Sequence, residues 1–160
     1  MSFADAIKQA EKEGQVGSGV FKPQEGKNAL RIVAGPIPHQ ETYQGEPRFK
    51  WLVAVIDRKD GQVKPWFMPH TIAKMIRDYQ TSDDYAFTGT PMPYDITLTA
   101  TGAGTRDVEY SVQPARKNTP ITADEQNAID KLGPLADFQR KIREKRGEDK
   151  AFDPDAEIPL

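Results

Sequence analysis

The chain has 160 residues, of which 37% are hydrophobic and 29% charged, and its formal net charge is −2. This length predicts one domain, with or without short terminal arms, that buries a core without help from metal or disulfides. The absence of cysteine excludes disulfides, thiolate nucleophiles and cysteine-ligated zinc. The first residues lack the apolar run of a signal peptide, and no stretch approaches the roughly 18 apolar residues of a membrane span, so we expect a cytoplasmic protein.

The charge is unevenly distributed along the chain. From Glu148 to Leu160 there are five acidic residues and one basic residue. The remaining 147 residues hold 22 − 1 = 21 basic and 24 − 5 = 19 acidic side chains, a net of +2. We therefore expect a mildly basic body followed by a disordered acidic tail over residues 148–160, whose carboxylates repel one another and stay solvated.

Residues 1–19 are expected to form a helical arm and a linker. Ser2 and Asp5 have the spacing of a helix cap, and the apolar residues of 2–13 fall on one stripe. The sequence GQVGSG that follows is typical of a flexible connector. We expect the stripe to pack on the body; a groove on a partner protein is the alternative.

The spacing of apolar residues changes from helical to alternating after Lys27. Alternation predicts five strands, and the Asp-Gly turn of RKDG predicts a hairpin between the second and third. The strands are expected at residues 29–33, 49–57, 63–68, 94–100 and 106–113, with a helix at 70–80 between the third and fourth. Strand, strand, strand, helix, strand, strand is the order of the OB-fold, a five-stranded partly open barrel. We therefore predict a mainly β fold with an OB-fold domain over residues 20–120.

Two further helices are predicted within residues 121–147. Thr122 and Glu125 have the spacing of a capping box for the first. Gly133 and Pro134 are expected to end that helix and begin the second. These helices lie between the predicted barrel and the acidic tail.

Enzymatic chemistry has little support in the sequence. His39 and His70 lie beside prolines without a ligand or triad partner at informative spacing, and we interpret them as ordinary surface residues. Asp83 and Asp84 are interpreted as a solvated turn or helix end. The Gly102–Gly104 segment joins two strands, whereas phosphate-binding loops lead from a strand into a helix. We expect no enzyme, no metal and no cofactor, with a small metal-dependent hydrolase or nuclease as the weakest alternative.

The second and third predicted strands carry aromatic and basic residues side by side. We expect Leu52, Ala54 and Ile56 to face inward, which places Phe49 and Trp51 on the opposite face. Aromatic rings interleaved with cations on these strands suit the stacking of unpaired bases beside phosphates. Either tryptophan alone is equally consistent with the core, to which we also assign Tyr79, Tyr94 and Tyr110. The nucleic-acid-binding residues that we predict are Arg31, Tyr43, Arg48, Phe49, Lys50, Trp51, Lys64, Trp66, Arg106, Arg116 and Lys117.

The stretch from residue 21 to 122 resembles the OB-fold single-stranded DNA-binding proteins of tailed bacteriophages. The resemblance lies in FKPQEGKNALRIVAGP, FKWLVAVIDRKDGQVKPWFMPHTIAKMI and PMPYDITLTATGAGTRDVEYSVQPARKNTPIT, and it rests on element order and hydrophobic pattern. It implies binding and protection of single-stranded DNA during phage DNA replication, recombination or repair, in the host cytoplasm. Some phage relatives hold a structural zinc with cysteines, and this chain has none.

The last residues, DPDAEIPL, are similar to the acidic terminus of bacterial single-stranded DNA-binding proteins. In that family the acids precede Ile-Pro and a final apolar residue, which enters an apolar pocket on replication and repair proteins. The usual final Phe is a Leu here. The resemblance implies that replication or recombination proteins bind Asp153, Asp155, Glu157, Ile158, Pro159 and Leu160.

The function that we predict is sequence-tolerant binding of single-stranded DNA by base stacking and phosphate neutralisation. An OB-fold RNA-binding module is the main alternative, because aromatic stacking serves both nucleic acids. The tail favours DNA metabolism. The sequence leaves the oligomeric state open.

Overall fold

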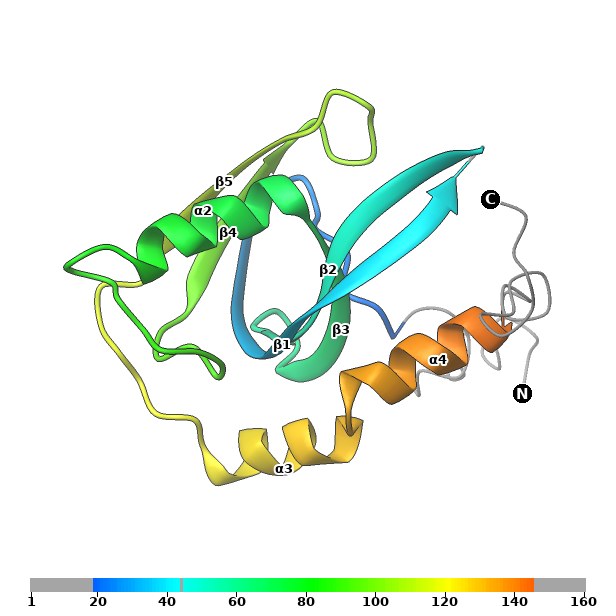
Figure 1. Ribbon diagram of the computed structural model, residues 1–160. Coiled ribbons are helices and arrows are strands. Elements are labelled where there is room, and N and C mark those ends of the chain that lie inside the picture. Colours follow the sequence, from blue (N-terminus) through cyan, green and yellow to red (C-terminus); the bar gives the residue numbers. More distant parts are fainter. Residues whose placement is uncertain (1–18, 44, 146–160) are drawn as a thin grey trace, which may run out of the picture.

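The computed structural model describes residues 19–43 and 45–145 (Figure 1). Its strands form one antiparallel sheet in the order β3-β2-β1-β4-β5. The strands are β1 (Gly26–Tyr43), β2 (Glu46–Asp57), β3 (Gln62–Pro69), β4 (Ile96–Thr101) and β5 (Glu109–Pro114), and the helices are α2 (His70–Gln80), α3 (Ala123–Leu132) and α4 (Leu135–Lys145). The predicted order of strands and helices is confirmed for these residues. The predicted N-terminal arm and acidic tail lie outside them.

The sheet is open between β3 and β5. Among the described residues, strand pairing ends at β3 on one side and at β5 on the other. The mainly β class is confirmed, while the closure of a barrel is not seen. None of the helices in the described part of the chain is long and apolar enough to cross a bilayer.

β1 bends so that it pairs with two different strands. Its first residues pair with β4, and from Leu30 onward it pairs with β2 as far as Tyr43. The register shifts on either side of Ala34, and a bulge of this kind bends a strand. Gly35 has a φ of 90° there, and a Cβ would lie 2.7 Å from the carbonyl oxygen of Leu52, so glycine is required.

The bend separates two projecting hairpins. We call residues 39–50 the β1–β2 arm and residues 102–108 the β4–β5 loop. Both point toward the top of Figure 1, and a gap separates them in that view. As predicted, the Gly102–Gly104 segment is a turn; the backbone N–H groups of Gly102 and Ala103 donate to Oε1 of Glu25 at 2.9 and 3.0 Å.

The larger core lies between the inner face of the sheet and α2. Val53 and Val55 of β2 pack there with Trp66 of β3 and with Ile72 of α2. All four side chains are at most 2% exposed. The hydroxyl of Tyr79 donates to the carbonyl oxygen of Val112 at 2.9 Å, which ties α2 to β5. The core positions predicted for the tyrosines are confirmed for Tyr94, which is 2% exposed.

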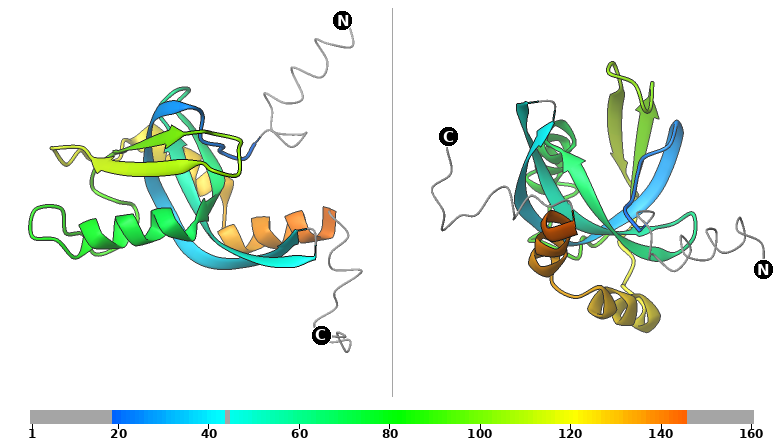
Figure 2. Two further views of the ribbon diagram at one scale, coloured as in Figure 1. Left: turned by 90° about the horizontal axis from the view of Figure 1, so that it is seen from above. Right: turned by 90° about the vertical axis from the view of Figure 1, so that its right-hand side faces the viewer.

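The opposite face of β2 is buried as well. Leu52, Ala54 and Ile56 are fully buried and pack with Leu135 of α4. The prediction that these three residues face the barrel interior is therefore wrong. Helices α3 and α4 cover the outer face of the sheet, away from α2 (Figures 1 and 2), and a strand covered on both faces loses its polar alternation.

A network of charged groups fastens α3 to the sheet. Nε of Arg31 donates to Asp95 at 2.7 Å, and Arg58 donates to the same carboxylate at 3.0 Å and to Glu125 of α3. The predicted capping box is confirmed, because the Glu125 N–H donates to the Thr122 hydroxyl at 3.1 Å while the Thr122 N–H donates to the Glu125 carboxylate at 3.0 Å. The backbone hydrogen bond from Thr122, followed by the hydrogen bond from Arg58, lowers the pKa of Glu125.

Candidate nucleic-acid interface

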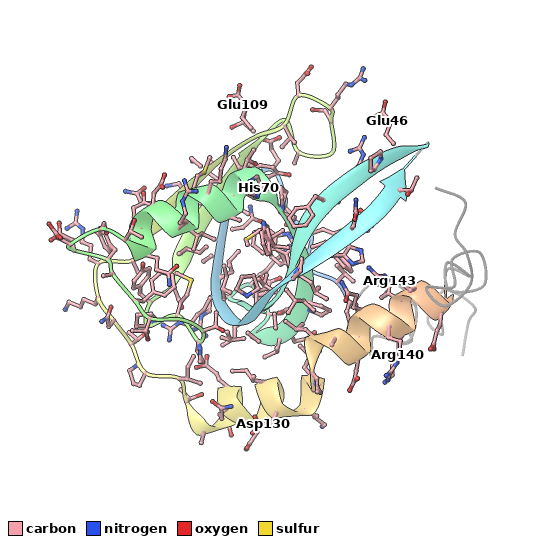
Figure 3. All side chains as sticks on the ribbon, in the orientation of Figure 1. Glu46, His70, Glu109, Asp130, Arg140 and Arg143 are labelled. Carbon is pink, nitrogen blue, oxygen red and sulfur yellow. The ribbon has the colours of Figure 1, made fainter. Side chains whose placement is uncertain are left out.

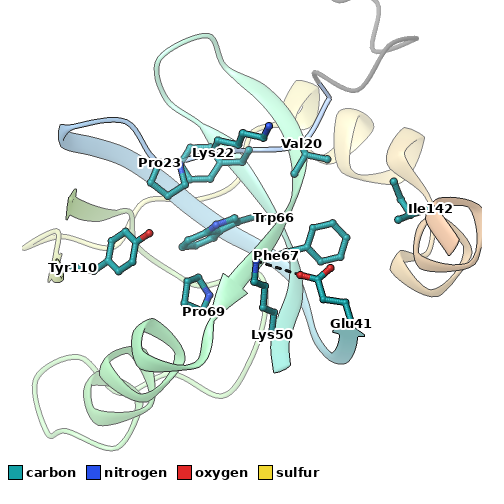
Figure 4. Close-up of a pocket in the computed structure, with 11 residues that line it drawn as sticks. Val20, Lys22, Pro23, Glu41, Lys50, Trp66, Phe67, Pro69, Tyr110 and Ile142 are labelled. Carbon is teal, nitrogen blue, oxygen red and sulfur yellow. Dashed lines mark ion pairs between the residues drawn. The ribbon is translucent and has the colours of Figure 1, made fainter. Parts of the chain in front are cut away.

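A pocket of about 640 Å³ opens along the free edge of β3, and we call it the edge pocket (Figure 4). Trp66 and Phe67 of β3 line it on one side, and Tyr110 of β5 lines it on the other. The remaining walls come from the segment before β1, from the β1–β2 arm and from α4. The edge pocket thus occupies the space between the two unpaired edges of the sheet.

The segment before β1 narrows this opening. The N–H of Phe21 donates to the carbonyl oxygen of Pro65 at 2.8 Å, so the segment takes one hydrogen-bonding position on the β3 edge. The Phe21 ring meets the Trp66 ring edge-on, with centroids 5.2 Å apart. Covering a free strand edge with a loop is a common protection against unwanted pairing. Here the segment covers only part of the β3 edge, and the edge pocket lies along the uncovered part.

The three rings of the edge pocket differ in how much surface they offer. Trp66 is 2% exposed and belongs to the core. Of the two interpretations of this residue, base stacking or core packing, the structure supports core packing. Tyr110 and Phe67 are half-buried, and in Figure 4 they lie on opposite sides of Trp66. Tyr110, which we assigned to the core, contacts the core and also lines the pocket. Its ring is therefore shared between the core and the pocket lining.

Two lysines and one glutamate give the edge pocket a net charge of +1. Lys22 is exposed, and Lys50 is half-buried with its Nζ 3.4 Å from a carboxylate oxygen of Glu41. Both lysines and Glu41 line the pocket (Figure 4). The glutamate lowers the attraction that the two cations exert on a phosphate.

A second group of aromatic residues, Phe49, Trp51 and His70, lies at the base of the β1–β2 arm, and we call it the aromatic cluster. The rings of Phe49 and Trp51 meet edge-on at 4.9 Å, and Nε1–H of Trp51 donates to Nδ1 of His70 at 3.0 Å. Phe49 is 44% exposed, and among the residues described it is the one large hydrophobic residue that is exposed. His70 is the first residue of α2, at the end nearer to the arm (Figure 3). Phe49 therefore presents ring surface to solvent, whereas Trp51 is half-buried and packs against the larger core. The stacking role predicted for both residues stays a prediction.

Several predicted residues do not take part in either group. Arg31 is fully buried and donates to Asp95 and Thr119, so the prediction that it lines a groove is wrong. Arg116 and Lys117 are exposed on the segment between β5 and α3, away from the residues that line the edge pocket. Arg106 is exposed on the β4–β5 loop.

Lys64 is held by two carboxylates. Its Nζ lies 3.0 Å from Asp57 and 2.6 Å from Asp60. Burial by itself lowers the pKa of Lys64, but the hydrogen bonds and charges of Asp60 and Asp57 outweigh this effect and raise it. The two carboxylates offset the charge of Lys64, so this lysine attracts a phosphate less than an unpaired lysine would.

Two predicted residues remain on the β1–β2 arm. Arg48 is exposed there, opposite Glu41 in the register of β1 and β2. The side chain of Tyr43 lies outside the part of the chain whose side chains are described. The tail residues predicted to bind partners also lie outside it.

The histidines have two different environments. His39 is 1% exposed, its ring lies 4.6 Å from that of Phe67, and its Nδ1 is 2.9 Å from Nε2 of Gln139 in α4. Its interpretation as a surface residue is therefore wrong, because α4 covers it. His70 is exposed, as expected, although it also positions Trp51.

The structure brings four predicted residues into two groups, with Lys50 and Trp66 in the edge pocket and Phe49 and Trp51 in the aromatic cluster. Sequence reasoning missed Lys22, Phe67 and Tyr110, which come from three separate parts of the chain. The alternation of β5 was the one signal that placed Tyr110 on a defined face. Lys22 gave no such signal, because it precedes the first strand.

The residues described hold no cluster of histidine, aspartate or glutamate side chains that would coordinate a metal ion. Asp83 and Asp84 are exposed in a turn, as expected. The chain matches no family model, no curated protein and no solved structure in the three comparisons made.

Proposed function

We propose that this chain is an OB-fold protein of the phage type that binds single-stranded DNA with little sequence preference. The observation that carries the proposal is the edge pocket, where the half-buried rings of Phe67 and Tyr110 lie beside the cations Lys22 and Lys50. Proteins that hold unpaired strands combine stacking rings with cations along the backbone.

The arrangement of the strands supports this assignment. OB-folds bind oligonucleotides on strands two and three and on the loops that join strands one to two and four to five. The edge pocket uses β3 and the β1–β2 arm, and β5 forms its far wall. The position of α2 between β3 and β4 agrees with the same fold.

The shape of the site favours single strands over duplexes. The stacking surfaces lie in a hollow beside one sheet edge, where a splayed base has access to a ring face. A duplex keeps its base faces stacked inside the helix and offers only its groove edges and phosphates. Binding by stacking therefore requires unpaired bases.

The acidic tail gives the proposal its second part. We propose that Asp153, Asp155, Glu157 and the last three residues recruit replication or recombination proteins. The support is the sequence alone, in which acids spaced along a polar terminus precede an apolar end.

The experiment that tests DNA binding is a titration of tryptophan fluorescence and anisotropy with oligo-dT, with a matched duplex and with the matched RNA. We expect oligo-dT to bind at least about 10-fold more tightly than the duplex, because stacking contributes about 1–3 kcal/mol per base. Tighter binding of RNA than of oligo-dT would favour the RNA-binding alternative. No binding of any of the three would overturn the proposal.

A further inference from the structure

A second pocket, of about 320 Å³, lies between α2, the bend of β1 and the segment that precedes β4, and we call it the α2 pocket. Ile32, Val53 and Met68 are among the buried apolar residues that form its interior. Its volume is in the range of pockets that hold small organic ligands. An apolar hollow of this size can receive a flat ring.

The aromatic cluster borders the α2 pocket. Trp51 and His70 line the pocket, and their rings are inclined by only 29°. The exposed Phe49 ring lies 4.9 Å from the Trp51 ring and 6.2 Å from the His70 ring. The hydrogen bond from Trp51 to His70 holds the indole in this position, so its face is presented without further ordering.

Two cations lie on the same pocket wall. Lys74 and Arg77 are exposed, are three residues apart on α2 and both line the pocket. Arg77 pairs with the exposed Asp78 at 3.3 Å, and no ion pair joins Lys74 to any residue that the structure describes. None of the described residues that line the pocket is acidic. The charge therefore favours an anionic group next to the flat apolar one.

The α2 pocket adjoins the edge pocket across one pair of residues. Lys50 of β2 lies opposite Pro69 of β3, and both line the edge pocket. Their chain neighbours Trp51 and His70 line the α2 pocket. A single DNA strand that leaves the edge pocket over Lys50 and Pro69 thus reaches the aromatic cluster.

We propose that the α2 pocket is a second subsite for the same DNA strand, in which one unpaired base stacks on Trp51 while neighbouring phosphates meet Lys74 and Arg77. The proposal rests on the proposed function, since it extends the path of that strand. A nucleotide combines a flat ring with an adjacent negative charge, which are the two features the pocket and its rim complement. A purely apolar ligand would make no use of the two cations.

The first test compares two double variants with equal loss of charge. Lys74→Ala with Arg77→Ala removes the cations of the α2 pocket, and Lys131→Ala with Arg140→Ala removes two exposed cations of α3 and α4. For an oligo-dT of about 12 nucleotides in about 0.1 M salt, we expect the first variant to lose roughly 10- to 30-fold in affinity, because each phosphate contact carries a salt slope of about −0.7. The control should lose less than about 3-fold.

The second test observes the pocket directly. Trp66→Phe leaves Trp51 as the single tryptophan, and its fluorescence should be quenched by the oligonucleotide of about 12 residues and much less by one of about 4, which fills the edge pocket alone. If Trp66→Phe fails to fold, the comparison of the double variants decides. Normal binding of the longer oligonucleotide with unchanged Trp51 fluorescence and equal double variants would overturn the subsite but leave the proposed function standing.

Two further outcomes identify a different situation. If no oligonucleotide binds the wild-type chain, the proposed function fails and the subsite fails with it. If removing residues 148–160 changes Trp51 fluorescence in the absence of DNA and abolishes the difference between the double variants, the pocket holds the chain's own terminus instead of a base. That result would also overturn the subsite.

Discussion

The Nε1–H of Trp51 donates a hydrogen bond to Nδ1 of His70 at 3.0 Å, across the junction between β2 and α2. Because Nδ1 accepts, a neutral His70 carries its proton on Nε2, which leaves that N–H available for an outside acceptor. The bond also fixes the indole beside the exposed Phe49 ring. The two tryptophans of the chain therefore have different roles, since Trp66 has no comparable exposure.

This difference gives the first prediction. Trp51→Ala should weaken binding of oligo-dT by roughly 5- to 100-fold, because a stacked base contributes about 1–3 kcal/mol. Trp66→Ala should instead lower the free energy of unfolding by about 3–5 kcal/mol, because it leaves a cavity in the core. The measurements are urea denaturation and DNA affinity of both variants.

Phe49→Ala is the matched control for folding. Phe49 is 44% exposed, so its removal should cost little stability while it reduces DNA affinity in the same direction as Trp51→Ala. If Trp51→Ala proved as unstable as Trp66→Ala, and Phe49→Ala bound DNA normally, the aromatic cluster would be part of the core only.

The second prediction concerns the carboxylate in the edge pocket. Glu41→Gln keeps the shape of the side chain but removes its charge, which leaves Lys22 and Lys50 unopposed. We expect oligo-dT to bind about 5-fold more tightly at 0.1 M salt, which is the gain from roughly one additional phosphate contact. Asp124→Gln, at an exposed position in the first turn of α3, is a control for the change in net charge. Equal affinities of the two variants would show that DNA does not enter this pocket.

The outcome for β2 shows how far sequence patterns reach. Alternation and the RKDG turn were enough to predict the order of the strands, and the spacing of Thr122 and Glu125 predicted the cap of α3. Alternation did not show which face of β2 points inward, because residues 52–56 are buried on both faces. A pattern within one strand carries no information about helices that arrive later in the chain to cover it.

The residues that line the edge pocket could not be predicted from the sequence for a related reason. Lys22, Phe67 and Tyr110 are brought together by the bend of β1 and by the missing pairing between β3 and β5. Such a juxtaposition depends on where the sheet ends. Local propensity predicts strands, but it does not predict which two strand edges remain unpaired. For Arg31 the sequence misled in the opposite direction. We predicted that this basic residue lines the groove, but it is buried and pairs with Asp95.

The third prediction concerns the network at α3. The Thr122 backbone and then Arg58 lower the pKa of Glu125, so the folded state binds this proton less readily than the unfolded chain. The resulting stability is present above the unfolded pKa of about 4.3 and is lost as the pH falls through the lower folded value. Glu125→Gln should reduce the free energy of unfolding by about 1–2 kcal/mol at pH 7. This is toward the lower end of the about 1.5–3 kcal/mol of a hydrogen bond to a charged group, because Gln can still complete the capping box.

The check is urea denaturation of both proteins from pH 7 to about pH 3. The difference between wild type and Glu125→Gln should shrink as the pH falls, because both side chains are then neutral. Asp130→Asn on the same helix is the control, because Asp130 is exposed and contacts only Gln126 among the hydrogen-bonded side chains described. A constant difference at every pH would contradict the assigned role of the Glu125 charge.

The fourth prediction is that the acidic tail competes with DNA for the basic surfaces. Its five carboxylates are joined covalently to the body, and such a connection raises their effective concentration toward sites on the same molecule. Removing residues 148–160 takes away five acids and one base, so the formal charge changes from −2 to −2 + 5 − 1 = +2. Affinity for oligo-dT should rise, and it should rise most at low salt, where screening is weakest.

Leu160→Ala separates the two proposed roles of the tail, because it leaves the charge unchanged and should weaken partner binding only. The measurement is the affinity of the full-length, truncated and Leu160→Ala chains at two salt concentrations. Equal affinities of the full-length and truncated chains at low salt would mean that the tail does not reach the DNA site, and partner recruitment would be its one remaining role.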